Sequence, residues 1–278
     1  MSKKQTTRIV ASTLLAVASV VYVSPLFIIF INSFKSRTSI SLDPFRLPTS
    51  ETFIGWENYL TGINDFGFLG SVGWTLMITV GSVAAILLFC SMFAWFITRW
   101  KSKFSRVMFL LCVFSMVVPF QMVMFTLSLT ADRMGLNTPW GIIVVYLGFG
   151  AGLSVFLFTG FVKSIPLEIE EAATIDGCAP LAVFFRIVLP IMQPTYITVG
   201  ILQTMWIWND FLLPYLVLDR RQYTTISMVI QMMRGSFGRV DMGAIMACLV
   251  MAVIPMIVFY LFAQKYIIEG VAAGAVKG

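Results

Sequence analysis

Long apolar stretches alternate along the chain with shorter segments in which polar, charged, glycine and proline residues gather. A helix crosses the hydrocarbon core of a bilayer with roughly 20 mostly apolar residues, and each stretch reaches that length. The stretches cover about 9–33, 71–98, 107–130, 139–162, 195–218 and 241–263. The pattern predicts an all-α integral membrane protein with six transmembrane helices, organised as one transmembrane domain over residues 1–278.

The first stretch starts like a signal peptide, with Lys3, Lys4 and Arg8 ahead of the apolar residues. The apolar run is too long for the core of a signal peptide, and no A-x-A-like cleavage site follows it before Phe34. We therefore expect a retained helix whose N-terminus lies on the inner side of the membrane.

The loop after the second stretch gives the clearest indication of orientation. Its basic residues are Arg99, Lys101, Lys103 and Arg106. Short loops follow the positive-inside rule most closely, so this loop is expected on the cytoplasmic side. With six spans, both termini and the connection 163–194 then lie inside as well.

Composition supports a membrane protein and excludes several functions. Hydrophobic residues make up 59% of the chain and charged residues 12%, whereas soluble domains carry about 25% charged residues. The net charge of +6 comes from basic residues scattered between the apolar stretches, so no continuous patch for nucleic acid is expected. There is no histidine, and the four cysteines lack C-x-x-C spacing, which argues against metal sites and a disulfide framework.

The connection 163–194 holds a dense group of carboxylates, namely Glu168, Glu170, Glu171 and Asp176. Pro166 suits the first turn of a helix, and carboxylates in the next turns suit the positive end of its dipole. Gly177 can adopt positive φ and end that helix, after which Pro180 can start another. We expect two short helices at an angle, the second ending near Pro190.

Residues in this connection also follow a fixed spacing. The run Glu171-Ala172-Ala173, then Gly177, then Ile187-x-Leu189-Pro190 reads E-A-A-x3-G-x9-I-x-L-P. This run resembles the EAA motif of the membrane subunits of ABC importers. The W-N-D-F stretch at 208–211 and the C-terminal G-A-V-K-G resemble the carbohydrate-uptake (maltose/multiple-sugar) branch, in particular subunits like the second membrane component of the maltose importer.

The resemblance implies that 163–194 is a cytoplasmic coupling loop that docks on a separate ATPase. The residues it assigns to this coupling are Glu170, Glu171, Ala172, Ala173, Asp176, Gly177, Ile187, Leu189 and Pro190. Because the chain has no G-x4-G-K-[ST] loop, ATP and Mg²⁺ are expected on a partner pair of ATPase subunits, and no cofactor on this chain.

The resemblance also implies further partners and a location. A second, homologous permease is expected to complete the pore, with a homodimer as the alternative. An extracytoplasmic sugar-binding protein is expected to deliver the solute. The chain is then a multi-pass protein in contact with the lipid of a bacterial or archaeal plasma membrane.

Polar residues inside the apolar stretches are candidates for lining a solute pathway, because they are costly in hydrocarbon. The candidates are Gln121, Gln203, Trp206, Asn209 and Asp210. On a continuous helix, Gln203, Trp206, Asp210 and Pro214 share one face that suits a sugar. An equally supported alternative is that Asp210 pairs with backbone or a neighbouring subunit and that the tryptophans pack. Gln121 is weaker, since a kink at Pro119 alone explains both residues.

The predicted outer loop 219–240 is basic, and its arginines are Arg220, Arg221, Arg234 and Arg239. A solvated loop is the simpler interpretation of the residues alone. The resemblance implies instead that this surface meets the binding protein.

The function implied by the resemblance is a permease subunit that passes a sugar or oligosaccharide by alternating access, with ATP hydrolysis on another chain. The chain itself is then not an enzyme. Alternatives are an importer permease for an amino acid or polyamine, a secondary transporter, and a membrane-embedded enzyme. A single carboxylate within the spans, no histidine and no evident inverted repeat argue against the last two.

Overall fold

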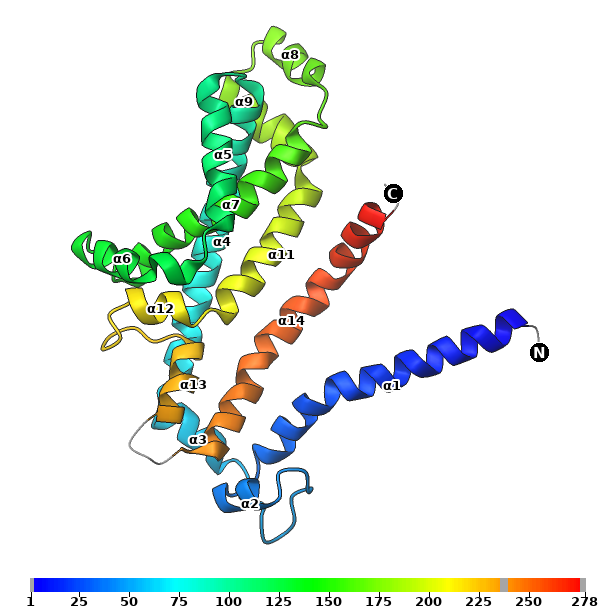
Figure 1. Ribbon diagram of the computed structural model, residues 1–278, viewed down its shortest axis with the longest axis vertical. Helices are drawn as coiled ribbons and strands as arrows, with labels where there is room; N and C mark the ends of the chain where they lie inside the picture. The colour runs from blue at the N-terminus through cyan, green and yellow to red at the C-terminus, as the bar shows by residue number, and fades with distance from the viewer. Residues whose placement is uncertain (1–2, 236–239, 276–278) are drawn as a thin grey trace. The chain divides into compact units, whose positions relative to one another are not determined.

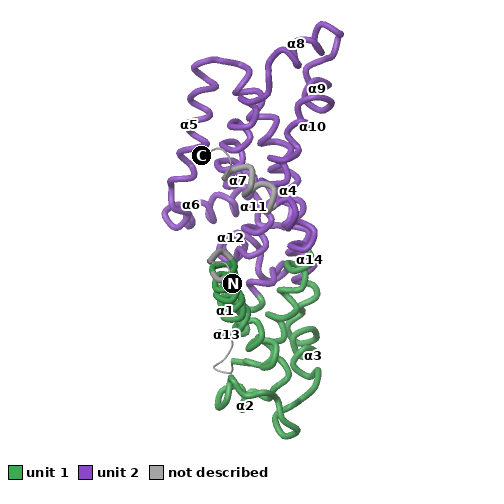
Figure 2. The backbone as a smooth tube through the Cα atoms, turned by 90° about the vertical axis from the view of Figure 1, so that its right-hand side faces the viewer, with its two compact units in different colours: residues 1–70, 229–258 green, residues 71–228, 259–278 purple. Residues whose placement is uncertain are grey.

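The computed structural model describes residues 3–235 and 240–275 (Figure 1). Over this part of the chain the regular structure is helical, and extended pairing is limited to one isolated bridge between Lys35 and Phe53. The prediction of an all-helical chain is therefore confirmed. The chain divides into two compact units, residues 1–70 with 229–258 and residues 71–228 with 259–278 (Figure 2).

The first unit contains a long apolar helix followed by short helices. Its elements are α1 (Lys3–Asn32), α2 (Arg37–Leu42), α3 (Glu57–Asn64), most of α13 (Ile226–Gly235) and the first part of α14 (Met242–Ala275). The apolar pattern gives no sign of α2 and α3, because both helices are short and only partly apolar. Gly55 and Gly67, both at positive φ, mark the turns around α3.

Buried polar groups hold the segment after α1 in place. The Lys35 ammonium, 1% exposed, donates to the carbonyl oxygens of Asp43 at 2.6 Å and Arg46 at 3.0 Å. The Asn58 amide of α3 donates to the carbonyl oxygens of Ser33 at 2.8 Å and Lys35 at 3.0 Å. Burial lowers the pKa of Lys35, and the negative charge of Asp43 opposes this shift.

The second unit is a helical bundle with short helices at its ends. Its elements are α4 (Phe68–Arg99, from residue 71), α5 (Lys103–Val117), α6 (Phe120–Arg133), α7 (Pro139–Val162), α8 (Leu167–Ile175), α9 (Pro180–Val183), the π-helical η1 (Phe184–Val188), α10 (Leu189–Ile191), α11 (Gln193–Asn209) and α12 (Leu212–Val217). Helices α4, α5, α7 and α11 lie side by side, and α8 lies beyond one end of them (Figures 1 and 2).

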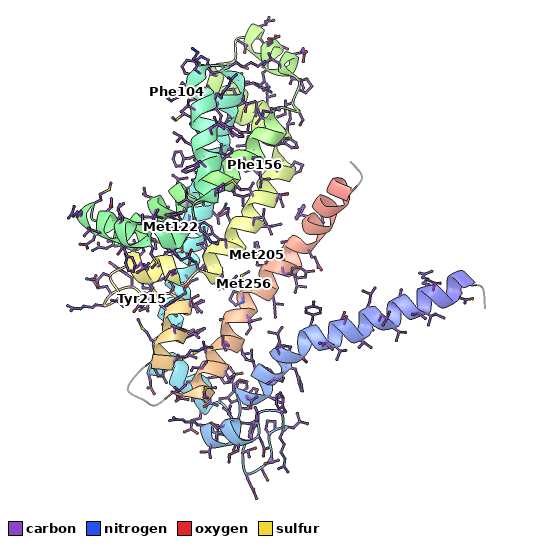
Figure 3. The ribbon with its side chains drawn as sticks, viewed as in Figure 1. Phe104, Met122, Phe156, Met205, Tyr215 and Met256 are labelled. Atoms are coloured by element: carbon purple, nitrogen blue, oxygen red, sulfur yellow. The ribbon has the colours of Figure 1, made fainter. Side chains whose placement is uncertain are left out.

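Glycines of α7 bring neighbouring helices close. A Cβ atom on Gly150 would lie 2.5 Å from Cδ1 of Ile86 on α4, and one on Gly152 would lie 2.9 Å from the carbonyl oxygen of Cys112 on α5. Small residues at such crossings let backbones approach, as is common between membrane helices. On the outer surface, the labelled side chains of Phe104, Phe156 and Met205 are exposed (Figure 3).

Four described helical segments are long and apolar enough to cross a membrane, namely Thr7–Asn32, Phe68–Arg99, Pro139–Val162 and Met242–Tyr266. Two further pairs of helices pass the same test together but are sharply bent. Helices α5 and α6 meet at 108°, and the run 180–191 meets α11 at 78°. If each bent pair counts as one span, the chain has up to six.

Two of the six predicted stretches are not continuous helices. The stretch 107–130 breaks at Val118 and Pro119, because proline lacks an N–H and disfavours helical geometry in the residue before it. The stretch 195–218 breaks at Asp210, whose ψ of 131° is extended. The predicted single face from Gln203 to Pro214 is therefore wrong, because these residues lie on different helices.

Candidate functional site

The connection after α7 forms the expected short helix, α8, which follows Pro166 and ends at Ile175. Gly177 then adopts φ +85°, a conformation that residues with a Cβ rarely adopt. The N–H of Cys178 donates to the carbonyl of Ala173, and that of Gly177 to the carbonyl of Thr174, both at 3.0 Å. This pair of bonds is the Schellman arrangement, so Gly177 ends α8 as its sequence position predicts.

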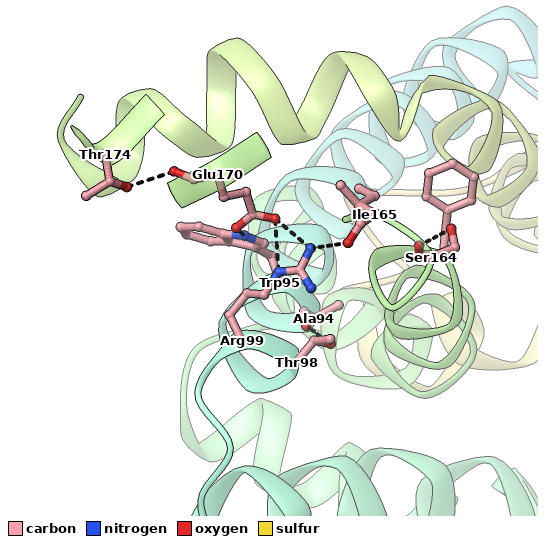
Figure 4. Close-up of polar contacts among 9 residues, drawn as sticks. Ala94, Trp95, Thr98, Arg99, Ser164, Ile165, Glu170 and Thr174 are labelled. Carbon is pink, nitrogen blue, oxygen red and sulfur yellow. Dashed lines mark hydrogen bonds and ion pairs between the residues drawn. The ribbon is translucent and has the colours of Figure 1, made fainter. Parts of the chain in front are cut away.

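Glu170 fastens α8 to the end of α4 (Figure 4). Its Oε1 accepts from Nε of Arg99 at 2.9 Å and from Nη2 at 2.6 Å, while its Oε2 accepts from Nε1 of Trp95 at 2.9 Å. Arg99 Nη2 also donates to the carbonyl of Ile165, just ahead of α8, at 3.0 Å. We call Trp95, Arg99 and Glu170 the α4–α8 clamp.

The side chains of the α4–α8 clamp are largely buried, so their contacts constrain both α4 and α8. The Glu170 side chain is 7% exposed and the Arg99 side chain 20% exposed. A carboxylate that receives three hydrogen bonds, two of them from one guanidinium, is held in both position and direction. Trp95 also packs against Phe184 of η1, with ring centroids 5.4 Å apart. One residue of α4 therefore contacts both helices of the connection.

The other predicted coupling residues divide between exposed and packed positions. Glu171, Ala172 and Asp176 are exposed on α8, whereas Ala173 is buried. Ile187 and Leu189 are half-buried, and Pro190 is exposed. The helix from Pro180 continues through Pro190 to Ile191, slightly beyond its predicted end.

Apolar side chains are also exposed on α8. Ile169 is 42% exposed and Ile175 85% exposed, on a helix that belongs to none of the candidate spans. Together with the three exposed polar and small residues named above, they make the outer face of α8 (Ile169, Glu171, Ala172, Ile175 and Asp176). Such a mixed face outside the spans is typical of a surface that another protein covers.

Two of the predicted pathway residues, Trp206 and Asp210, adjoin Tyr146 of α7 at the C-terminal end of α11. Asp210 accepts from the Tyr146 hydroxyl at 3.0 Å through Oδ2 and from the backbone N–H of Leu212 at 3.0 Å through Oδ1. Asp210 therefore caps α12 and joins it to α7. This geometry favours the alternative in which Asp210 pairs within the chain.

Gln203 is buried as well. Its Nε2 donates to Ser154 Oγ at 3.0 Å and to the Gly150 carbonyl at 3.4 Å, while its Oε1 has no partner among the described residues. Trp206 is 41% exposed and stands edge-on to Tyr146, with ring centroids 5.5 Å apart.

Two other pathway candidates are exposed. Asn209 donates to the Met205 carbonyl at 2.7 Å, and Gln121 lies in the first turn of α6. With Trp206, three of the five pathway candidates are therefore exposed, namely Gln121, Trp206 and Asn209.

Two of the four arginines of the predicted outer loop, Arg220 and Arg221, lie together in the second unit. Arg220 stacks on Tyr215, 4.5 Å from the ring centroid, and with Arg221 it lines a cavity of about 670 Å³. Arg234 is exposed on α13, in the first unit. Arg239 lies outside the described residues.

Residues 88–272 match the family of binding-protein-dependent transport system inner membrane components. The chain belongs to this family. It is 37% identical over 262 residues to the probable starch degradation products transport system permease protein of Thermoanaerobacterium thermosulfurigenes, a match that covers 94% of each chain. It is 32% identical to the multiple sugar-binding transport system permease protein of Streptococcus mutans, over 95% of each.

A solved structure supports the same fold for this inner membrane component. It is a bacterial ABC transporter involved in the import of the acidic polysaccharide alginate, with a TM-score of 0.81 and 23% sequence identity. The match covers 96% of this chain and 98% of the other.

Three residues that hold the candidate site residues in place, Trp95, Arg99 and Tyr146, are not predicted as site residues from the sequence. Arg99 was interpreted only as a marker of orientation, and Trp95 and Tyr146 were not singled out. Trp95 and Arg99 are four residues apart, so they share one face at the end of α4, and that spacing was the available signal. Their partner, Glu170, is 71 positions away from Arg99, and no local pattern pairs them.

Proposed function

We propose that this chain is the permease subunit of a binding-protein-dependent ABC importer that moves a sugar or oligosaccharide across a bacterial or archaeal plasma membrane. Membership of the family supports the importer, and the names of both relatives support a carbohydrate. In this proposal each bent helix pair counts as one span, and six spans place both termini on the cytoplasmic side.

The α4–α8 clamp carries the mechanism that we propose. A separate pair of ATPase subunits binds ATP and Mg²⁺ and seats against the outer face of α8. When the ATPases close, α8 moves as a rigid body because Gly177 ends it and Glu170 fixes its inner side. Arg99 passes the movement to α4, and Trp95 passes it to η1. This chain hydrolyses nothing; its helices open to one side of the membrane and then to the other.

In this proposal the exposed pathway candidates, Trp206, Asn209 and Gln121, contact the solute. The ring of Trp206 can stack on a pyranose, and the amides of Asn209 and Gln121 can hydrogen-bond to hydroxyl groups. The hydrogen bonds of Asp210 stabilise the bent backbone between α11 and α12. A second, homologous permease completes the pathway, and the extracytoplasmic binding protein docks near Arg220 and Arg221.

Transport by the reconstituted complex tests this proposal. The chain is purified with its cognate permease, ATPases and binding protein, and uptake into proteoliposomes is measured with and without ATP. The solutes are labelled malto-oligosaccharides, raffinose, an amino acid and a polyamine. ATP-dependent uptake of a saccharide alone is expected. Uptake of the amino acid or polyamine instead would overturn the substrate class, and uptake driven by an ion gradient without ATP would overturn the mechanism.

A further inference from the structure

A basic cavity of about 780 Å³ lies where α4, the loop 100–102, the start of α5 and the end of α7 meet. The cations that line it are Arg99, Lys101, Lys103, Arg106 and Lys163. No carboxylate is present among the described residues of its lining. Arg99 is paired with Glu170, so four cations remain to attract an anion into this space.

The start of α5 adds to the positive potential of the basic cavity. Ser102 caps this helix by accepting from the N–H of Ser105 at 3.0 Å, and both residues line the cavity. The N-terminus of a helix carries about half a positive charge and favours phosphate oxygens.

Thr159 offers a further hydrogen-bonding group beside these cations. It lies on α7, lines the basic cavity and is 4% exposed, and its hydroxyl has no hydrogen-bond partner among the described residues. Buried hydroxyl groups nearly always have a partner, so this one is available for a hydrogen bond to a molecule in the cavity.

Apolar surface borders the same cavity. Phe109 of α5 lines it, and Lys163 Nζ lies 5.5 Å from the centroid of that ring. Leu110, Phe114 and Val117 recur at helical spacing on the face of α5 that Arg106 begins, and each is more than half exposed. A ligand of the cavity therefore meets cations at one end and an apolar helix surface at the other.

We propose that the basic cavity binds the phosphate headgroup of an anionic phospholipid whose acyl chains run along α5. Clusters of Lys and Arg at a cytoplasmic membrane surface recognise such headgroups, whereas a zwitterionic headgroup adds a cation that this lining repels. The inference goes beyond the proposed function and takes from it only that this end of the second unit lies at the inner membrane surface.

Lipid retention by the purified transporter tests the site. The complex is exchanged into detergent with equal amounts of phosphatidylglycerol and phosphatidylcholine, and bound lipid is counted by native mass spectrometry. Phosphatidylglycerol is expected to be retained at least about tenfold more than phosphatidylcholine. An Arg106→Gln, Lys163→Gln double variant should lose this preference. A control, Arg133→Gln with Arg186→Gln, loses the same charge outside the cavity and should keep it.

A second variant distinguishes specific binding of the headgroup in the cavity from nonspecific attraction by the basic residues. Thr159→Val keeps the shape and the charge of the cavity, so it should fold normally and weaken phosphatidylglycerol retention by about tenfold. Equal retention of both lipids, or a Thr159→Val variant that binds as the parent does, would overturn the proposal. Displacement of the lipid by millimolar inorganic phosphate would reassign the cavity to a free anion. No ATPase activity is read in this experiment, so its failure leaves the transport proposal standing.

Discussion

At the scale of single residues, Glu170 and Glu171 show that adjacent residues of the connection can have different environments. Both are glutamates, but Glu170 is buried against Arg99 and Trp95 while Glu171 is exposed. The family resemblance implied a coupling role for both without separating them. The distinction depends on the direction in which α8 packs, which only the folded chain defines.

Removal of the Glu170 charge should uncouple transport. Glu170→Gln leaves the Arg99 guanidinium partly buried without a counter-ion, and breaking a fully buried pair costs about 3–5 kcal/mol. Because the Arg99 side chain is 20% exposed, the loss here should fall below that range. We expect ATP-dependent uptake to drop by tenfold or more (about 1.4 kcal/mol of coupling) while membrane levels persist. Glu57→Gln, which removes the charge of an exposed carboxylate in the first turn of α3, is the control and should transport normally.

Gly177 should tolerate only residues that adopt positive φ. Gly177→Asn should retain most uptake because asparagine visits this region readily, whereas Gly177→Val should lose it through strain at the end of α8. Gly177→Asp adds a charge at the same bend and should also lose uptake. Normal transport by the aspartate variant would contradict the coupling role of α8.

Substitution of Asp210 should lower stability, whereas substitution of Trp206 should weaken the binding of the solute. Asp210→Ala removes the α12 cap and the Tyr146 partner, so the melting temperature should fall, with a loss of roughly 1–3 kcal/mol. Trp206→Ala should leave the melting temperature nearly unchanged and raise the KM for the solute. Asp210→Asn keeps one acceptor oxygen for the Leu212 N–H and replaces the other by an amide N–H that the Tyr146 hydroxyl can accept. If this variant raised KM at full stability, Asp210 would belong to the solute pathway after all.

At the scale of helices, the hydrophobic pattern predicted α4 and α7 closely but missed both breaks. The bounds of α7 are those of the predicted stretch 139–162, because Thr138 caps its start and Pro139 suits its first turn. At 107–130 the apolar pattern continues across Pro119 although the backbone turns. At 195–218 the break falls at Asp210, four residues before Pro214, whose ring is incompatible with a helical carbonyl at that position. The Tyr146 hydroxyl, 64 residues away, donates to Asp210 at this break, and no local pattern predicts that contact.

Packing between α5 and α7 should depend on Gly152 and not on Gly148. A Cβ on Gly152 would approach Cγ of Met116 to 2.7 Å and a backbone carbonyl to 2.9 Å, whereas one on Gly148 meets nothing within 4 Å. Gly152→Ala should therefore lower stability by about 1–3 kcal/mol. Thermal denaturation in detergent, with Gly148→Ala as the control, measures the difference.

At the scale of the whole molecule, the family and the helical fold were predictable because many positions along the sequence indicate each of them. The E-A-A-x3-G-x9-I-x-L-P spacing alone fixes several positions in one connection, and the family match extends from residue 88 to residue 272. Partners leave a weaker trace, because a face covered by another chain resembles an ordinary exposed surface in sequence. The single domain over 1–278 and the placement of both termini inside stay predictions.

Labelling of single cysteines tests the orientation. In a background with Cys90, Cys112, Cys178 and Cys248 all replaced by alanine, a Glu168→Cys variant should react with a membrane-impermeant maleimide only after the cells are permeabilised. An Arg220→Cys variant should react in intact cells. The reverse pattern would invert the topology and remove the cytoplasmic placement of α8.

The different environments of Glu170, which is buried, and Glu171, which is exposed, predict two kinds of genetic suppressor. If the ATPase seats on the outer face of α8 as proposed, compensating changes in the ATPase gene should restore growth on the transported sugar after a defect in Glu171. A defect in Glu170 lies inside one polypeptide, and its suppressors should map to this gene alone, near codons 95 and 99. A selection for revertants would therefore locate the boundary between subunits without a structure of the assembled importer.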